Sequence, residues 1–271
     1  MEPGDGRPER VALDPSRVRA VIFDCFGTLV PGTPIARRAS DAAATAAHLD
    51  VDPAAFHALL HATFTERATG AMGDGVTTLR LLARRLGANP TPAALEQAAR
   101  LRRAQLRRDM QPRADALATL VRLRGAGYRL GLLSDCGPEV PAIWPSLPLA
   151  RLIDATTFSA DVGRRKPHPI LYRRVCSAVG VEPEECLYVG DGDSHELTGA
   201  ARMGMAAVRL AADDPVAALV HYDHDTLWDG PQVTCLADVP ALLGVGARTA
   251  PEVQEARTRE DPPGRPAPVG Q

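Results

Sequence analysis

The sequence predicts an α/β fold, in which a mostly parallel sheet is covered on both faces by helices and carries an inserted α-helical cap domain. Short apolar runs of β type alternate with helical runs along most of the chain, which is typical of such sheets. The first two β-type runs are also much farther apart than one strand–helix–strand step requires. We expect the strands at 18–23, 128–133, 186–189, 206–210 and 233–236, and core helices at 114–124, 138–144, 169–179, 194–203 and 239–243.

The cap is indicated by the spacing after the first strand. The second β-type run ends about 110 residues after Asp24, whereas one strand–helix–strand step needs about 30. The surplus, at roughly 31–110, is rich in Ala, Leu and Arg and has apolar residues at helical spacing, as in Phe56, Leu60 and Phe64. A cap that enters just behind Asp24 would lie over that residue, exclude water and select the substrate.

The remaining segments complete the predicted domain organisation. The core would consist of 16–30 and 111–246, with the cap between these two parts. Residues 1–15 and 247–271 are rich in Pro and Gly, so we expect disordered tails there.

Composition excludes several classes of protein. The net charge of −2 gives no reason to expect nucleic acid or a membrane surface as partner. The five cysteines are scattered without a CxxC pair, which favours a reducing compartment over a disulfide framework or a zinc site. The acidic, Pro/Gly-rich start does not resemble a signal peptide, and no apolar stretch approaches the ~20 residues that span a bilayer. We therefore expect a cytoplasmic monomer or homodimer.

Two strand ends supply acidic residues. The run Val21–Val30 stops being apolar at Asp24, and Gly27 and Thr28 open a tight loop directly behind it. A second apolar strand ends at Asp191, with Glu196 five residues further on. The carboxyl ends of parallel strands meet at one edge of a sheet, so these carboxylates should lie close together and repel one another unless a divalent cation, usually Mg²⁺, lies between them.

Two further loops supply groups that would bind a phosphate. Ser134 and Asp135 end the β-type run at 128–133, where a hydroxyl can donate to a phosphoryl oxygen. Lys166 is the single lysine among 31 basic residues, the other 30 being arginine. A lysine kept in so arginine-rich a chain indicates a place where a compact ammonium is needed.

Together, the Asp24, Ser134, Lys166 and Gly190–Glu196 loops resemble those of the haloacid dehalogenase-like (HAD) superfamily of hydrolases, over about residues 18–245. The resemblance implies a Rossmann-like core and a Mg²⁺-dependent phosphatase acting on a small phosphate ester or acyl phosphate. It implies that Asp24 is the nucleophile and forms an aspartyl-phosphate. The implied phosphate-binding residues are Gly27, Thr28, Ser134, Asp135 and Lys166. The implied metal ligands are Asp24, the carbonyl of Phe26 and Asp191, with Glu196 either as a further ligand or as the residue that holds a metal-bound water.

One position departs from the phosphatase pattern. The residue two after the nucleophile is usually a second Asp that protonates the leaving group, and here it is Phe26. An aromatic residue at this position resembles the haloacid dehalogenase branch, which is the alternative function. A catalytically silent protein that binds phosphate esters is another. Cap residues that could replace the missing acid are His57, His61, Glu66 and Asp74.

Two polar clusters are given structural interpretations. The arginines of the second half of the cap are expected to form a solvated helix face, whose contribution to function would be limited to attracting an anionic substrate. These residues are Arg80, Arg84, Arg85, Arg100, Arg102, Arg103, Arg107 and Arg108. The tract 221–225 contains two His and two Asp, and we interpret it as a polar surface turn rather than a metal site.

Overall fold

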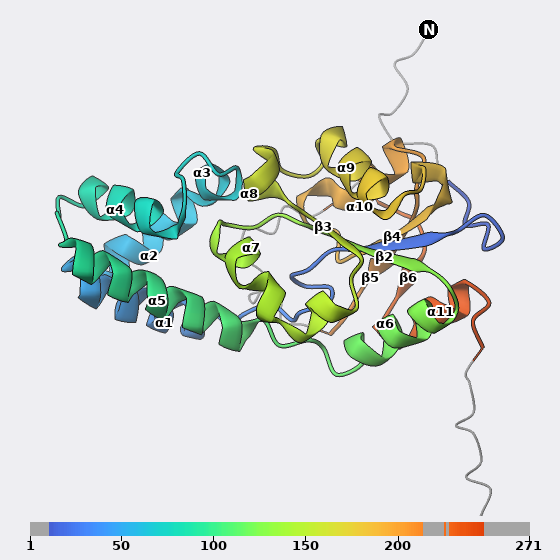
Figure 1. The fold of residues 1–271 in the computed structure, drawn as a ribbon, viewed down its shortest axis with the longest axis horizontal. Helices are drawn as coiled ribbons and strands as arrows, with labels where there is room; N and C mark the ends of the chain where they lie inside the picture. Colours follow the sequence, from blue (N-terminus) through green and yellow to red (C-terminus); the bar gives the residue numbers. More distant parts are fainter. Residues whose placement is uncertain (1–10, 214–224, 226–227, 247–271) are drawn as a thin grey trace, which may run out of the picture.

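A parallel sheet forms the centre of the computed structural model, which describes residues 11–213, 225 and 228–246 (Figure 1). Within these residues the sheet has six strands in the order β3-β2-β1-β4-β5-β6, and every neighbouring pair is parallel. The strands are β1 (Ala20–Phe23), β2 (Arg129–Ser134), β3 (Ala155–Phe158), β4 (Cys186–Gly190), β5 (Ala206–Leu210) and β6 (Gln232–Val233). The predicted α/β class is confirmed.

Helices cover both faces of the sheet. Helices α9 (Pro169–Val179) and α10 (Glu196–Arg202) pack on one face, and α6 (Ala116–Gly125) and α11 (Val239–Leu242) lie on the other (Figure 1). The shorter helices of the core are α7 (Glu139–Ile143) and α8 (Ser159–Val162), and its 3-10 turns are η1 (Trp144–Ser146), η2 (Pro148–Arg151), η3 (Pro183–Glu185), η4 (Asp193–His195) and η6 (Leu236–Asp238).

Strand β1 shows why both faces are buried. Successive side chains of a strand point to opposite faces. Ala20 and Ile22 accordingly join the hydrophobic cluster under α9 and α10, while Val21 and Phe23 join the cluster under α6 and α11. A strand that is apolar at every position therefore belongs in the middle of the sheet, and it ends where the first polar residue, Asp24, follows.

The insertion between β1 and β2 is helical, as predicted. Its helices have a hydrophobic cluster of their own, which includes Phe56, Leu82 and Leu95. Helices α1 and α5 lie side by side along it (Figure 1). The five helices of the insertion that precede α6 are α1 (Ile35–Leu49), α2 (Pro53–Ala62), α3 (Phe64–Ala68), α4 (Gly75–Arg85) and α5 (Pro92–Asp109).

The entry and exit of the insertion are held together. Gly27 turns the chain at a φ of 82°, and its N–H donates to the Val30 carbonyl at 2.7 Å. Arg113, just beyond the cap, donates to the carbonyls of Gly27 (2.7 Å) and Thr28 (2.8 Å). The loop behind Asp24 is therefore fixed by the segment through which the chain returns to the core.

Three expectations about elements were wrong. Strand β3 was not expected, because it has four residues, two of them threonine, and lies at the sheet edge, so it forms no long apolar run. The last strand covers only Gln232–Val233, and the chain continues into η6. Helix α10 begins at Glu196 instead of 194, because Ser194 and His195 have left-handed φ values of 56° and 51°.

The structure describes only a small part of the two predicted tails. Residues 1–10 and 247–271 lie outside the described part of the chain, while 11–15 are described. Within the described residues no helix is long and apolar enough to cross a membrane.

Candidate active site

Four functional side chains meet at the carboxyl edge of the sheet. Asp24 follows β1, Ser134 ends β2, and Asp191 follows β4, so the three central strands deliver them to one place. Lys166 comes from the loop between α8 and α9. All four side chains are buried. The sequence-based expectation that these loops come together agrees with this geometry.

Lys166 is bound between two carboxylates. Its Nζ donates to Asp24 Oδ1 at 2.6 Å and to Glu196 Oε2 at 2.5 Å. Glu196 Oε2 also accepts from the Tyr188 hydroxyl at 2.8 Å, and its Oε1 accepts from the Gly192 N–H at 3.0 Å. Both oxygens of Glu196 are thus occupied, which favours a role in holding Lys166.

The backbone at Gly190 leaves room for this arrangement. A Cβ at position 190 would lie 2.1 Å from Glu196 Oε1, so only glycine allows the carboxylate to approach β4.

Acidic groups outnumber basic groups at this place. Carboxylate oxygens of Asp24, Asp191 and Glu196 lie within 4.8 Å of one another, with Lys166 as the adjacent cation. Burial, followed by the charges of Glu196 and Asp24, raises the pKa of Asp191 well above its usual value. Burial also raises the pKa of Asp24, although the Lys166 ammonium acts in the opposite direction. Burial opposes the charged form of Lys166, but Asp24 and Glu196 together raise its pKa well above the ordinary value.

Unused polar atoms point to what would complete the site. Asp191 Oδ2, Ser134 Oγ and Thr28 Oγ1 are buried and have no hydrogen-bond partner among the described residues. Buried polar atoms are nearly always paired in folded proteins. An oxygen-ligated divalent cation fits the unused carboxylate oxygen and the excess negative charge, and an anion fits the two hydroxyls.

The other predicted phosphate-binding residues differ in their surroundings. Asp135 accepts hydrogen bonds from the Lys166 N–H (3.0 Å) and from Arg165 Nε (3.2 Å), so one of its roles is to hold the loop that carries Lys166. Gly27 and Thr28 form the turn behind Asp24, and their carbonyls are bound by Arg113.

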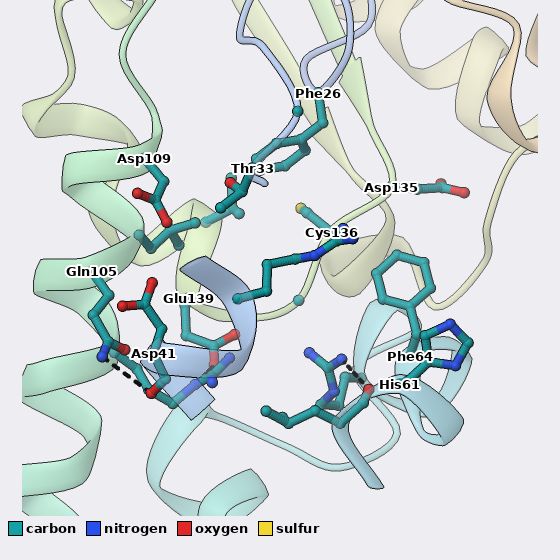
Figure 2. A pocket seen from close by; sticks show the side chains of 18 of the residues that line it. Phe26, Thr33, Asp41, His61, Phe64, Gln105, Asp109, Asp135, Cys136 and Glu139 are labelled. Carbon is teal, nitrogen blue, oxygen red and sulfur yellow. Dashed lines mark hydrogen bonds and ion pairs between the residues drawn. The ribbon is translucent and has the colours of Figure 1, made fainter. Parts of the chain in front are cut away.

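A cavity of about 560 Å³ connects these residues with the cap. Asp24, Lys166 and Asp191 lie on its core side. Figure 2 shows Phe26 and His61 at well-separated places on its wall. The Phe26 side chain lines the cavity instead of an acid.

The candidates for a replacement acid divide into two pairs. His57 and His61 line the cavity. Asp74 instead accepts from the Thr77 N–H at the start of α4. Glu66 pairs with Arg85 on the exposed surface of the cap. Neither Asp74 nor Glu66 is among the residues that line the cavity.

Arg165 is a site residue that sequence reasoning missed. It donates to Asp135 Oδ2 at 3.2 Å, to Ser194 Oγ at 3.1 Å and to Thr65 Oγ1 of the cap at 3.1 Å. Its guanidinium also lies 4.8 Å from the centre of the Phe64 ring. Its position next to Lys166 was the available signal, but nothing in the sequence reveals that one side chain joins three loops and the cap.

Two further interpretations need correction. Asp225 is buried and not part of a surface turn: it accepts from the Thr198 N–H (2.7 Å) and hydroxyl (2.6 Å) in the first turn of α10. The rest of the tract, 221–224, lies outside the described residues. Arg102 does not belong to a solvated face, since it lines the cavity and pairs with Glu139.

Comparison with known proteins agrees with this geometry. Residues 18–204 match the family model of haloacid dehalogenase-like hydrolases. The chain belongs to this family. A curated HAD relative, glyceraldehyde 3-phosphate phosphatase of Methanopyrus kandleri, is 30% identical over 199 residues, which cover 71% of this chain and 84% of the relative. Another, (S)-2-haloacid dehalogenase 4A of Burkholderia cepacia, is 33% identical over 97 residues, covering 35% of this chain and 42% of the relative.

Solved structures show the same HAD fold. An L-2-haloacid dehalogenase from Xanthobacter autotrophicus superimposes with a TM-score of 0.57 at 22% identity, over 84% of this chain and 98% of that one. A HAD phosphatase from Thermococcus onnurineus gives 0.56 at 22% identity, over 84% and 99%. At such identities the likeness concerns the fold, and both activities occur on it.

Proposed function

We propose that this HAD hydrolase is a Mg²⁺-dependent phosphatase that acts on a small phosphate ester or acyl phosphate through Asp24. The observation that carries the proposal is the buried group of three carboxylates around one ammonium, in which Asp191 Oδ2 has no partner among the described residues. A phosphate, itself an anion, could approach these carboxylates only if a cation balanced their charge, and a divalent metal ion would supply that charge. The phosphatase relative supports the same reaction class.

Asp24 and Asp191 would hold Mg²⁺, together with the Phe26 carbonyl, and Glu196 would act from the outer sphere through Lys166 and Tyr188. When bound, the ion would supply positive charge that lets a carboxylate and a phosphate approach each other.

The chain's own residues carry the chemistry. The Asp24 carboxylate attacks phosphorus, a P–O bond to Asp24 forms, and the P–O bond to the leaving group breaks. Lys166 stays bound to Asp24 Oδ1 and balances the charge of the transferring group, while Ser134 Oγ and Thr28 Oγ1 donate to phosphoryl oxygens. Water then attacks phosphorus, releases phosphate and restores the carboxylate. Phe26 provides no proton, so acyl phosphates and other good leaving groups should react fastest.

The test is phosphate release from a panel of phosphomonoesters and acetyl phosphate, with Mg²⁺ or with EDTA. We expect release that requires Mg²⁺ and that Asp24→Asn reduces by about a thousandfold or more. Release that persists in EDTA or in Asp24→Asn would contradict the mechanism.

A haloacid dehalogenase is the second candidate, favoured by Phe26 and by the dehalogenase relative. There Asp24 would attack the carbon that bears the halogen, and water would hydrolyse the resulting ester. Halide release from 2-haloacids, with no phosphate release, would establish this reaction instead. If neither product forms while phosphate esters still bind, the chain is a binding protein on this fold.

A further inference from the structure

Two arginines on the cap side of the cavity have donors that the protein does not use. Arg67 of α3 donates from Nη2 to the Leu60 carbonyl at 2.7 Å, but its buried Nε has no partner among the described residues. Arg102 of α5 donates from Nε to Glu139 Oε1 at 3.0 Å and makes no other hydrogen bond or ion pair within the described part of the chain. Both residues line the cavity that contains Asp24.

The charges of this cluster do not cancel. Glu139 of α7 pairs with Arg102, and its charge also acts on Arg67, so the three side chains carry a net charge of +1 when all are ionised. Burial opposes ionisation of Glu139, but Arg102 and Arg67 together hold its pKa below the ordinary value. Burial, followed by the charge of Arg102, lowers the pKa of Arg67 to about 10, so it stays protonated at neutral pH.

The acidic residues of the cap that line the cavity, Asp41 and Asp109, pair with other arginines. Asp41 pairs with Arg108 at 2.6 Å. Asp109 pairs with Arg108 at 2.9 Å and with Arg37 at 3.5 Å. The positive charge of Arg67 and Arg102 is therefore available to a ligand.

We propose that Arg67 and Arg102 bind a carboxylate of the substrate while its phosphate lies at Asp24, so that the substrates are small phosphorylated carboxylic acids. This rests on the proposed phosphatase function. Planar guanidinium groups with free donors match the planar, two-oxygen carboxylate. A cavity of about 560 Å³ accommodates both groups of a small molecule at once.

The experiment compares 2-phosphoglycolate with 2-hydroxyethyl phosphate, two esters that differ in one carboxylate and whose leaving alcohols are of similar acidity. For each we would measure kcat and KM, and also the Kd for the Asp24→Asn protein by calorimetry. We expect the wild type to have a higher kcat/KM for 2-phosphoglycolate than for 2-hydroxyethyl phosphate. We expect the Asp24→Asn protein to bind 2-phosphoglycolate with the lower Kd.

Two variants should shift this preference in opposite directions. Arg102→Gln brings the cluster to zero net charge and should reduce the preference by about 10- to 100-fold, the range for a charge-assisted hydrogen bond. Glu139→Gln raises the net charge to +2 and should maintain or increase the preference. Arg100→Gln, an exposed arginine of the same helix, is the matched control for charge.

Each outcome separates the two proposals. Turnover of both esters without a preference would overturn the carboxylate site and leave the phosphatase standing. Absence of turnover, with a binding preference that Arg102→Gln in the Asp24→Asn background removes, would overturn the phosphatase and support the site. A loss of preference in both Arg102→Gln and Glu139→Gln would show that the cluster is only structural.

Discussion

Phe26 is the residue at which this site differs most from the phosphatase pattern. It lines the cavity two residues after Asp24, where a carboxylic acid would be able to protonate the departing oxygen. An aromatic ring has no proton to give, so the barrier for a poor leaving group should remain high.

Phe26→Asp should therefore raise turnover of alkyl phosphates by about 100-fold, the lower range for a general acid, while acetyl phosphate changes little. Steady-state rates for the two substrate types would measure this. Phe26→Asn is the matched control, because asparagine has the same shape as aspartic acid and no acidic proton. An equal change for both substrate types, or in both variants, would show that the ring acts only through packing.

Asp191 provides a test of the metal site that does not depend on turnover. In the proposed site Mg²⁺ binds the folded state only, so it should raise the melting temperature with increasing concentration. Asp191→Asn should lose that rise, and without metal it should melt higher than the wild type because one of three crowded carboxylates is gone.

Differential scanning calorimetry with Mg²⁺ or EDTA measures both effects, with the exposed Glu184→Gln as control. A Mg²⁺ response that Asp191→Asn retains in full would place the ion elsewhere.

At the scale of elements, Arg165 joins the cap to the catalytic edge of the sheet. It contacts Thr65 and Phe64 of α3, Asp135 after β2, and Ser194 of η4. Displacement of the cap would break the contacts of Arg165 with α3 and leave its contacts with the core. The Arg165 side chain therefore couples the position of the cap to the position of the core loops.

Arg165→Lys keeps the charge but loses the planar fork, and we expect kcat/KM to fall by about tenfold. Amide hydrogen exchange should become faster both in α3 and in η4. A disturbance confined to one of these elements would accelerate exchange in that element alone. Arg164→Lys, on the exposed neighbouring residue, should change neither quantity. Faster exchange in only one of the two elements would contradict the coupling.

The elements that could be predicted from the sequence are those with a strong local pattern. Strand β1 is apolar at each position and ends just before Asp24, and α9 begins at Pro169 and ends before Gly180 as expected. Strand β3 could not be found, because its partners lie on β2 and its own residues carry little hydrophobic signal. The turn at Ser194 and His195 depends on contacts with Arg165 and Asp225 that only the tertiary structure provides.

At the scale of the whole molecule, the hydrophobic clusters separate the cap from the sheet. Phe56 belongs to a cluster built only from the insertion, whereas Leu120 belongs to the cluster under α6. Two separate clusters allow two regions to lose structure independently.

Phe56→Ala should therefore accelerate hydrogen exchange in α1, α2, α4 and α5 and leave β1 and β4 protected. A buried Phe→Ala change costs about 3–5 kcal/mol, enough to unfold a small region. Leu120→Ala is the counterpart in the core. A uniform acceleration across the chain in Phe56→Ala would show instead that the cap and the core unfold as one unit.

The same division explains what the sequence indicates about the site. Residues held by strand ends, such as Asp24 and Asp191, could be selected in advance because the sheet alone determines where they meet. Arg102 and Glu139 could not, because they meet only where the cap closes over the core. Their pairing depends on how two regions lie against each other, which no local pattern encodes.

Lys166 also has a consequence for chemical labelling. It is the only lysine of the sequence, and its amine lies buried between Asp24 and Glu196. Reagents that acylate amines should therefore find no lysine side chain to modify on the exterior of the protein, and the fully charged ammonium of Lys166 should react slowly even where they reach it. Any acylated lysine in a peptide digest would then report that the active site had opened.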